Sequence, residues 1–257
     1  AIKFAREYLC EPIHDMSSMF PMGLLEKARD SNLILLDKAE KDFDENGEVN
    51  GVFGQHFVGW DPAIASDANA DYTAMMILRI LPDSEEKQLV YVLNQKGMNS
   101  TAQKRQIIML NNRFQPDLIE LEGNNFQRMF EAELKDMRED IPIKTFMTTR
   151  QKKESMFMSL LMAFEQGQIR TPWGDEKSKE FTRALETQLS RFGMQKNGRL
   201  ESVGSHDDLA MALALANWAT KEFKGSIVLL DDYLDGFNDW FGDVPQRAVA
   251  GASWFTI

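Results

Sequence analysis

Three strand-like segments follow one another near the middle of the chain with only short links between them. They cover residues 55–61, 71–81 and 87–96, are rich in aliphatic and aromatic side chains, and the last two flank the turn sequence PDSEE. Short links of this kind pair consecutive strands antiparallel. This part of the chain therefore predicts a three-stranded antiparallel unit, and that constrains the fold more than any other feature.

Helices and strands alternate after the third strand. Residues 100–114 and 125–140 have helical patterns, and residues 116–122 and 141–148 read as strands. A helix between two strands favours a right-handed crossover to a parallel partner. The predicted fold is therefore α/β, with a mixed sheet of three antiparallel strands followed by parallel strands and flanked by helices. This is the order of the ribonuclease H-like fold.

Local end signals mark the remaining elements. Ser100 and Gln103 predict a capping box at the start of the helix 100–114. Two further helices are expected to end at Gly167 and Gly193, because glycine commonly follows the last helical residue. The Asn197-Gly198 pair predicts a hairpin turn before the last helix.

The composition divides the chain into three parts. Residues 1–50 start apolar and become acidic, which predicts a linker or arm; residues 51–222 form the expected folded domain; residues 223–257 form an aromatic and acidic tail. With 257 residues and 43% hydrophobic content, the chain can bury one sizeable core. The tail either folds back or binds a partner through its aromatic residues Trp240, Phe241, Trp254 and Phe255.

Charge and motif content exclude several classes of protein. The net charge of −11 argues against a broadly basic nucleic-acid binder, although a local basic strip stays compatible with it. No apolar run reaches the 18 residues that predict a membrane span, and the single Cys10 suits a reducing compartment. Nucleotide-binding P-loop, zinc-spacing and G-x-S-x-G motifs are also missing from the sequence.

Four carboxylates stand where the predicted fold could bring them together. Asp61 ends the first strand and Glu122 ends the fourth, so they lie side by side if these strands are parallel neighbours. Asp207 and Asp208 open the last helix, in GSHDDLAMALALANWA. Oxygen-only ligands favour Mg²⁺ or Mn²⁺. Two such ions, about 4 Å apart, can support phosphodiester hydrolysis.

Each of these acids also has a simpler interpretation. Asp61 before a proline suits a turn, and Glu122 before a glycine suits a solvated strand end. Asp207 and Asp208 suit the first turn of a helix whose N-cap is Ser205. Their combination favours the metal site. Asp71, Glu120 and His206 are candidate accessory groups, and Glu120 is also an alternative to Glu122 as the metal ligand.

Basic residues near the start of one predicted helix form a possible DNA contact. Arg150, Lys152 and Lys153 lie in TTRQKK, and Lys196 and Arg199 flank the predicted Asn-Gly turn. A solvated helix end explains the first three equally well.

Four segments carry a resemblance to a known family. FVGWDPA, DYTAMMIL, IELEGNNFQ and GSHDDLAMALALA together resemble the C-terminal nuclease domain of tailed-phage large terminase subunits. The earlier FAREYLCEP and SSMFP resemble the segment that joins the terminase ATPase domain to its nuclease. The resemblance covers about residues 1–220, and its motifs are specific only as a set.

The resemblance implies a metal-dependent, largely sequence-nonspecific endonuclease that cuts double-stranded DNA during genome packaging. By position, the acids of the family fall on Asp61, Glu122 and the pair Asp207/Asp208. Many relatives have another acid three residues after the second aspartate, where this chain has Met211. The implied partners are DNA, the terminase small subunit and the portal protein, in the cytoplasm of the host cell. The ATPase motor is outside this chain, so translocation is not expected of it alone.

Two other functions remain open from the sequence. A Holliday-junction resolvase or recombinase-type nuclease would use the same acids on a different DNA substrate. A non-catalytic docking module of a packaging complex would keep the acids for structure and use the tail to bind its partner.

Overall fold

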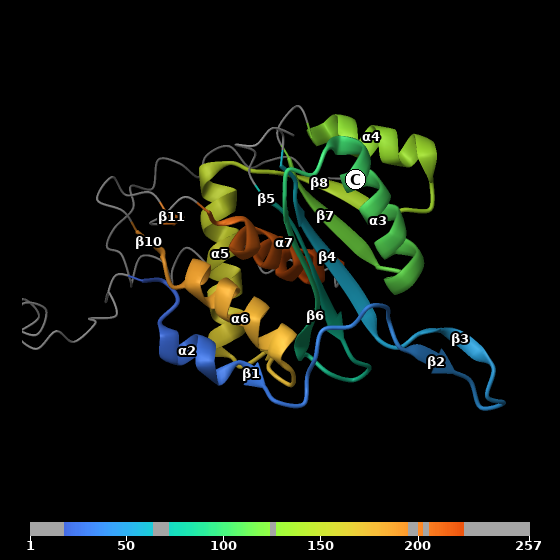
Figure 1. Cartoon of the computed structure of the whole chain (residues 1–257), viewed down its shortest axis with the longest axis horizontal. Coiled ribbons are helices and arrows are strands. Elements are labelled where there is room, and N and C mark those ends of the chain that lie inside the picture. The colour runs from blue at the N-terminus through green and yellow to red at the C-terminus, as the bar shows by residue number, and fades with distance from the viewer. Residues whose placement is uncertain (1–17, 64–71, 124–126, 195–199, 203–205, 224–257) are drawn as a thin grey trace, which may run out of the picture.

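Three long strands form the centre of the sheet, because each places apolar side chains on both of its faces. The computed structural model describes residues 18–63, 72–123, 127–194, 200–202 and 206–223 (Figure 1). The central strands pair antiparallel, as the short links predict, and they are β4 (Gln55–Asp61), β5 (Tyr72–Ile80) and β6 (Lys87–Lys96).

Two parallel strands extend the sheet beyond β4. β7 (Leu118–Gly123) pairs parallel to β4, and β8 (Ile143–Met147) pairs parallel to β7. Each is reached through a helix, α3 (Ser100–Phe114) before β7 and α4 (Gln127–Met137) before β8. The observed order β6-β5-β4-β7-β8 confirms the predicted mixed sheet and the ribonuclease H-like fold class.

The other edge of the sheet carries two short strands that the sequence pattern did not predict. β9 (Ile169–Pro172) pairs parallel to β6, and β1 (Arg29–Asp30) pairs parallel to β9. Both are too short to show a period of two, so only the pairing of the backbone defines them.

The described part of the predicted arm packs onto the domain. Phe20 and Leu25 are buried in the core, and Leu25 belongs to the short helix α2 (Met22–Lys27). The hairpin of β2 (Lys41–Phe43) and β3 (Val49–Val52) projects away from the sheet (Figure 1). In this structure residues 18–40 are thus part of the folded unit, while the boundary at residue 51 stays a prediction.

Helices cover both faces of the sheet. α3 and α4 lie on one face; the other is covered by α5 (Arg150–Glu165), α6 (Glu176–Leu189) and α7 (Asp208–Phe223) (Figure 1). Alternation along β4 separates these layers: Val58 and Trp60 join the core under α3 and α4. Gly59 therefore faces α7, and so does Asp61 two residues later.

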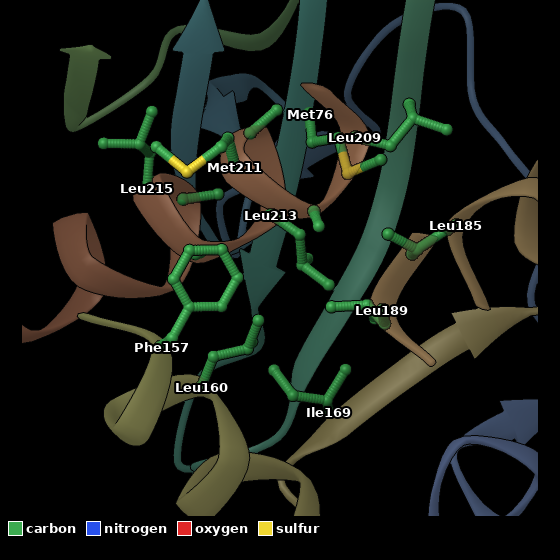
Figure 2. Packing of buried hydrophobic residues seen from close by; sticks show 14 of the residues in the cluster. Met76, Phe157, Leu160, Ile169, Leu185, Leu189, Leu209, Met211, Leu213 and Leu215 are labelled. Atoms are coloured by element: carbon green, nitrogen blue, oxygen red, sulfur yellow. The ribbon is translucent and has the colours of Figure 1, made fainter. Parts of the chain in front are cut away.

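α7 approaches the sheet closely because the contact is made by small residues. A Cβ atom at Gly59 would overlap the backbone of Ala212 and Ala216, so only glycine permits this spacing. On its other side α7 packs against α5 and α6, where Figure 2 shows Leu209 and Leu213 near Leu185 and Leu189. The start of α7 is thereby held against the end of β4. In the described part of the chain, none of the helices has the length and apolar run needed to cross a membrane.

The start of α3 corrects one local prediction. Asn99, and not Ser100, is the N-cap, and its side chain accepts a hydrogen bond from the amide of Ala102 at 2.8 Å. Gln103 forms no capping box, because its buried amide donates instead to the carbonyl oxygens of Ala63 and Met98, both at 2.9 Å. β10 (Phe192–Met194) pairs antiparallel with β11 (Leu200–Ser202), and the predicted Asn197-Gly198 turn lies outside the described residues.

Candidate functional site

Asp61 and Glu122 end neighbouring parallel strands, as expected. The register places Trp60 opposite Leu121, so the next residues of β4 and β7 are the two acids. Their carboxyl groups lie close enough for Glu122 to raise the pKa of Asp61 through its charge and through a hydrogen bond. Thr148, just after β8, donates its hydroxyl hydrogen to Glu122 Oε1 at 3.1 Å. The hydroxyl thus holds one carboxylate of the pair in place.

The pKa of Asp61 records which groups surround it. Burial raises this pKa well above its usual range, although the side chain keeps some exposure. The next causes are the negative charge and the hydrogen bond of Glu122, followed by the charges of Asp208 and Asp207. Only acids close in space repel in this way. Four carboxylates from β4, β7 and the start of α7 therefore meet at one end of the sheet.

The two aspartates at the start of α7 have different neighbours. Asp207 Oδ2 lies 3.2 Å from Lys153 Nζ of α5, which forms an ion pair with it. Asp208 is the first residue of α7 and is nearly buried, with Oδ2 3.6 Å from His206 Nδ1. His206 in turn packs edge-on against the ring of Tyr72, with centroids 5.1 Å apart. Lys153 therefore offsets the negative charge of Asp207, one of the four in the cluster.

The donor set fits a hard divalent cation. Among the described residues, no three acidic, histidine or cysteine side chains already stand in the arrangement of a metal-ligand set. The four carboxylates nevertheless supply only oxygen, the donor that Mg²⁺ and Mn²⁺ prefer. Their mutual repulsion, visible in the raised pKa of Asp61, is what a bound cation would remove. The chemistry of the cluster thus suits such an ion.

The structure brings Glu120 and His206 near the cluster. Glu120 lies on the same face of β7 as Glu122, opposite Gly59, and is fully buried. Several other residues singled out in the sequence lie outside the described ranges, namely Asp71, Lys196, Arg199, the expected N-cap Ser205 and the aromatic residues of the tail.

Met211 occupies the position at which many terminases have a further acid. Its side chain is buried in the core beneath α7, on the side of Leu215 and Phe157 (Figure 2). An acid there would be surrounded by apolar side chains, which would disfavour its charge. The contribution of α7 to the cluster therefore depends on Asp207 and Asp208.

Three of the five basic residues that were predicted to contact DNA lie at the start of α5, namely Arg150, Lys152 and Lys153. Lys153 faces the cluster through Asp207, while Arg150 is exposed and pairs with Glu154 at 2.9 Å. Lys152 is exposed, with its ammonium group 5.8 Å from the ring of Phe146. These side chains place positive charge at the edge of an otherwise acidic site.

Sequence reasoning missed Thr148 because nothing in its local pattern sets it apart. It stands beside Thr149, the N-cap of α5, whose side chain accepts from the amide of Lys152. A pair of hydroxyl residues before a helix predicts a cap, but does not say which of the two contacts another element. Only the position of β7 next to β8 brings Thr148 to Glu122.

A mixed sheet in this strand order, with acids at the ends of its central parallel strands and at the start of a covering helix, defines a ribonuclease H-like domain. The sequence also matches the family described as the terminase RNase H-like domain over residues 58–218, more than half of the chain. The protein belongs to this family. No curated protein sequence matches it.

Solved structures of terminase nucleases share the fold. The large terminase nuclease of thermophilic phage G20c with bound magnesium is 19% identical, with a TM-score of 0.55, covering 79% of this chain and 97% of that one. The nuclease domain of the P22 large terminase is 11% identical, with a TM-score of 0.53 and coverage of 82% and 95%.

A variant of the nuclease domain of the large terminase subunit of bacterial virus Sf6, with manganese and beta-thujaplicinol, is a third similar structure. It is 12% identical, with a TM-score of 0.55, and the match covers 78% of this chain and 98% of that one. At these identities the likeness concerns the fold. Two of the three similar domains hold Mg or Mn, the ions that the acids of this sequence predict.

Proposed function

We propose that this chain is the nuclease domain of a phage large terminase subunit and that it cuts double-stranded DNA by metal-dependent phosphodiester hydrolysis. The observation that carries the proposal is the meeting of four carboxylates from three elements, recorded in the raised pKa of Asp61. A structural cluster would pair these charges internally, whereas this one collects charges of the same sign. Membership of the terminase RNase H-like family supports a role in genome packaging.

Each acid has a proposed role. Asp61, Glu122 and Asp208 are the proposed catalytic residues, and together with Asp207 they would hold Mg²⁺ or Mn²⁺. Two bound ions supply an activated water and stabilise the leaving oxygen. Thr148 orients Glu122, and Lys153 balances Asp207. Glu120, His206 and Asp71 remain accessory groups in this proposal.

The DNA would lie along the basic residues at the edge of the site. Arg150, Lys152 and Lys153 lie at the start of α5 beside the acids, and Lys196 and Arg199 extend this strip in the proposal. The net charge of −11 implies weak binding of duplex DNA that falls as salt rises.

The rest of the proposal places the domain in a packaging motor. Residues 51–222 form the nuclease, residues 1–50 connect it to an ATPase domain, and residues 223–257 form a tail. The terminase small subunit and the portal protein are the proposed protein partners, in the cytoplasm of the infected cell.

The substitution Asp208→Asn tests the function. We expect cleavage of supercoiled plasmid with Mn²⁺ or Mg²⁺ to fall at least about a hundredfold, because the site loses a charged ligand. The metal-free melting temperature should stay unchanged or rise, since one of several repelling charges is removed. Both are measured on the same preparation.

Asp136→Asn is the matched control, because Asp136 is an exposed acid of α4. It should leave both cleavage and melting unchanged. Plasmid left intact by folded wild-type protein with either ion would contradict the proposed function. A destabilised but active Asp208→Asn variant would instead assign Asp208 to helix capping.

A further inference from the structure

The first turn of α7 receives its hydrogen-bond acceptor from another helix. A helix leaves its first amide groups without partners, and the side chain at the N-cap usually accepts from them. Asp207 occupies the N-cap position here, because its carbonyl oxygen accepts from the amide of Met211 at 2.8 Å. The amides of Leu209 and Ala210 nevertheless donate to Oε1 of Gln188, at 2.8 and 3.2 Å.

This arrangement separates capping from the acid cluster. An aspartate at the N-cap would ordinarily turn its carboxylate back toward the amides of the second and third helical residues. Asp207 instead pairs with Lys153, and both aspartates contribute to the raised pKa of Asp61. A neutral amide oxygen also satisfies the two donors without adding a fifth negative charge to the site.

Gln188 is well placed for this task because the end of α6 is anchored on both sides. Its neighbour Leu189 and the earlier Leu185 are buried against the start of α7 (Figure 2). Glu186 accepts two hydrogen bonds from the guanidinium group of Arg29, both at 2.8 Å. The last turn of α6 therefore holds the Gln188 side chain in a defined position.

We infer that Gln188 is a positioning residue of the nuclease site: it caps α7 from α6 and so keeps the carboxylates of Asp207 and Asp208 available to a divalent cation. The inference rests on the proposed function for the identity of the site. Without Gln188, an aspartate side chain turns back to accept from Leu209 and Ala210, and it leaves the cluster.

Gln188→Ala tests the inference in the full chain, with Gln188→Met as a second variant that keeps the side-chain volume but lacks a strong acceptor. Hydrogen exchange of a peptide covering residues 206–212, measured without metal, should become at least about tenfold faster in both variants, because two amides lose their acceptor. The Mn²⁺ concentration that gives half of the metal-induced rise in melting temperature should increase about tenfold. Cleavage should fall at limiting Mn²⁺ and recover at saturating Mn²⁺.

Two further variants separate positioning from general stability. Gln188→Glu keeps an acceptor at the same reach, so its exchange should stay within about twofold of the wild type and its Mn²⁺ requirement should not rise, although it adds a negative charge near the site. Thr187→Ala removes the neighbouring hydrogen bond of 2.7 Å to the carbonyl of Arg183 and should match the wild type.

Unchanged exchange and unchanged Mn²⁺ dependence in Gln188→Ala, with an active wild type, would overturn the inference. Equal losses in Gln188→Ala and Gln188→Glu would overturn it as well. A wild-type protein that neither cleaves DNA nor responds to Mn²⁺ would reject the proposed function. In that case the metal-free exchange still decides whether Gln188 caps α7.

Discussion

The two ends of β4 carry polar groups that are arranged in opposite ways. The acid end consists of Asp61, Glu122, Asp207 and Asp208. The opposite end of β4 has His56 and Arg79 on the face covered by α3, and Lys87 and Asn217 on the face covered by α7. Both ends place polar groups in or near the core, so burial alone does not distinguish them.

At the opposite end Arg79, Lys87 and Asn217 have partners from within the chain, whereas neither ring nitrogen of the buried His56 has a hydrogen-bond partner among the described residues. Lys87 Nζ donates to Asn217 Oδ1 at 2.7 Å, and Asn217 Nδ2 donates to Ser159 Oγ at 3.1 Å. Arg79 Nη1 pairs with Glu40 Oε2 at 2.5 Å and its guanidinium also donates to Gln88. A buried polar group that meets a complementary partner stabilises the fold and needs nothing further.

The acid end collects groups of one charge. Among the described residues, the ion pair of Lys153 with Asp207 offsets only part of the repulsion that raises the pKa of Asp61. Such a cluster is costly unless a cation joins it. The comparison indicates that complementary polar clusters in this protein are structural, whereas the like-charged cluster is where an external ligand belongs.

Asp61→Asn should produce the largest effect and would test the acid end directly. Loss of this carboxylate should reduce Mn²⁺-dependent plasmid cleavage at least about a hundredfold. Because the pKa of Asp61 is raised in the fold, the unfolded chain releases this proton at a lower pH than the fold does, so Asp61 lowers the stability of the metal-free fold as pH rises above about 4. The variant should therefore melt at the same or a higher temperature at pH 7 without metal. A variant that melts earlier and still cleaves would break the comparison.

The second test is the effect of His56 on the stability of the protein at low pH. Burial, followed by the charge of Arg79, lowers the pKa of His56 to about 4 from the ordinary value of 6.5. As pH falls, His56 of the unfolded chain binds a proton before His56 of the fold does. The free energy of unfolding should therefore be at its full value above pH 6.5 and should decrease between pH 6.5 and about pH 4. The loss should reach roughly 3 kcal/mol.

Urea unfolding of the wild type and of His56→Leu between pH 7 and pH 4 measures this loss. The leucine variant should lose less stability than the wild type over that range. Parallel curves for the two proteins would show that His56 does not titrate as its burial demands.

Asn217→Leu should have the smallest of these effects. It removes the acceptor of Lys87 and the donor to Ser159, which should lower the free energy of unfolding by about 1–3 kcal/mol. Cleavage per folded molecule should stay within about twofold of the wild type, because the acid end is untouched. Denaturant titration and plasmid cleavage on one preparation check both. A larger loss of activity than of stability would mean that the two ends are coupled.

The central order of the fold followed from local signals. Short links predicted the pairing of β4, β5 and β6, and the helix before β7 predicted its parallel position beside β4. Those two inferences were sufficient to place Asp61 next to Glu122. The short strands β1 and β9 carried no such signal, because their pairing depends on backbone groups of distant segments.

The side chains that cap α3 and α7 could not be predicted from the local sequence. The simpler interpretation of the last helix placed its N-cap on Ser205, and the Ser100/Gln103 pair predicted a capping box in α3. In the structure Gln103 instead binds Ala63 and Met98, and Gln188 accepts from the start of α7. A side-chain acceptor is chosen by distance, and distance between elements is absent from a sequence pattern.

The order of residues thus determined the strand sequence, the helices and the acids that stand at their ends, because turn residues, hydrophobic period and strand length act over a few neighbouring residues. The tertiary structure determined how those acids are supported. The close contact of Gly59 with α7, the hydroxyl of Thr148 on Glu122 and the amide of Gln188 on α7 each join residues at least 21 positions apart in the sequence. Their geometry arises from packing, in which many weak contacts together decide which side chain reaches which partner.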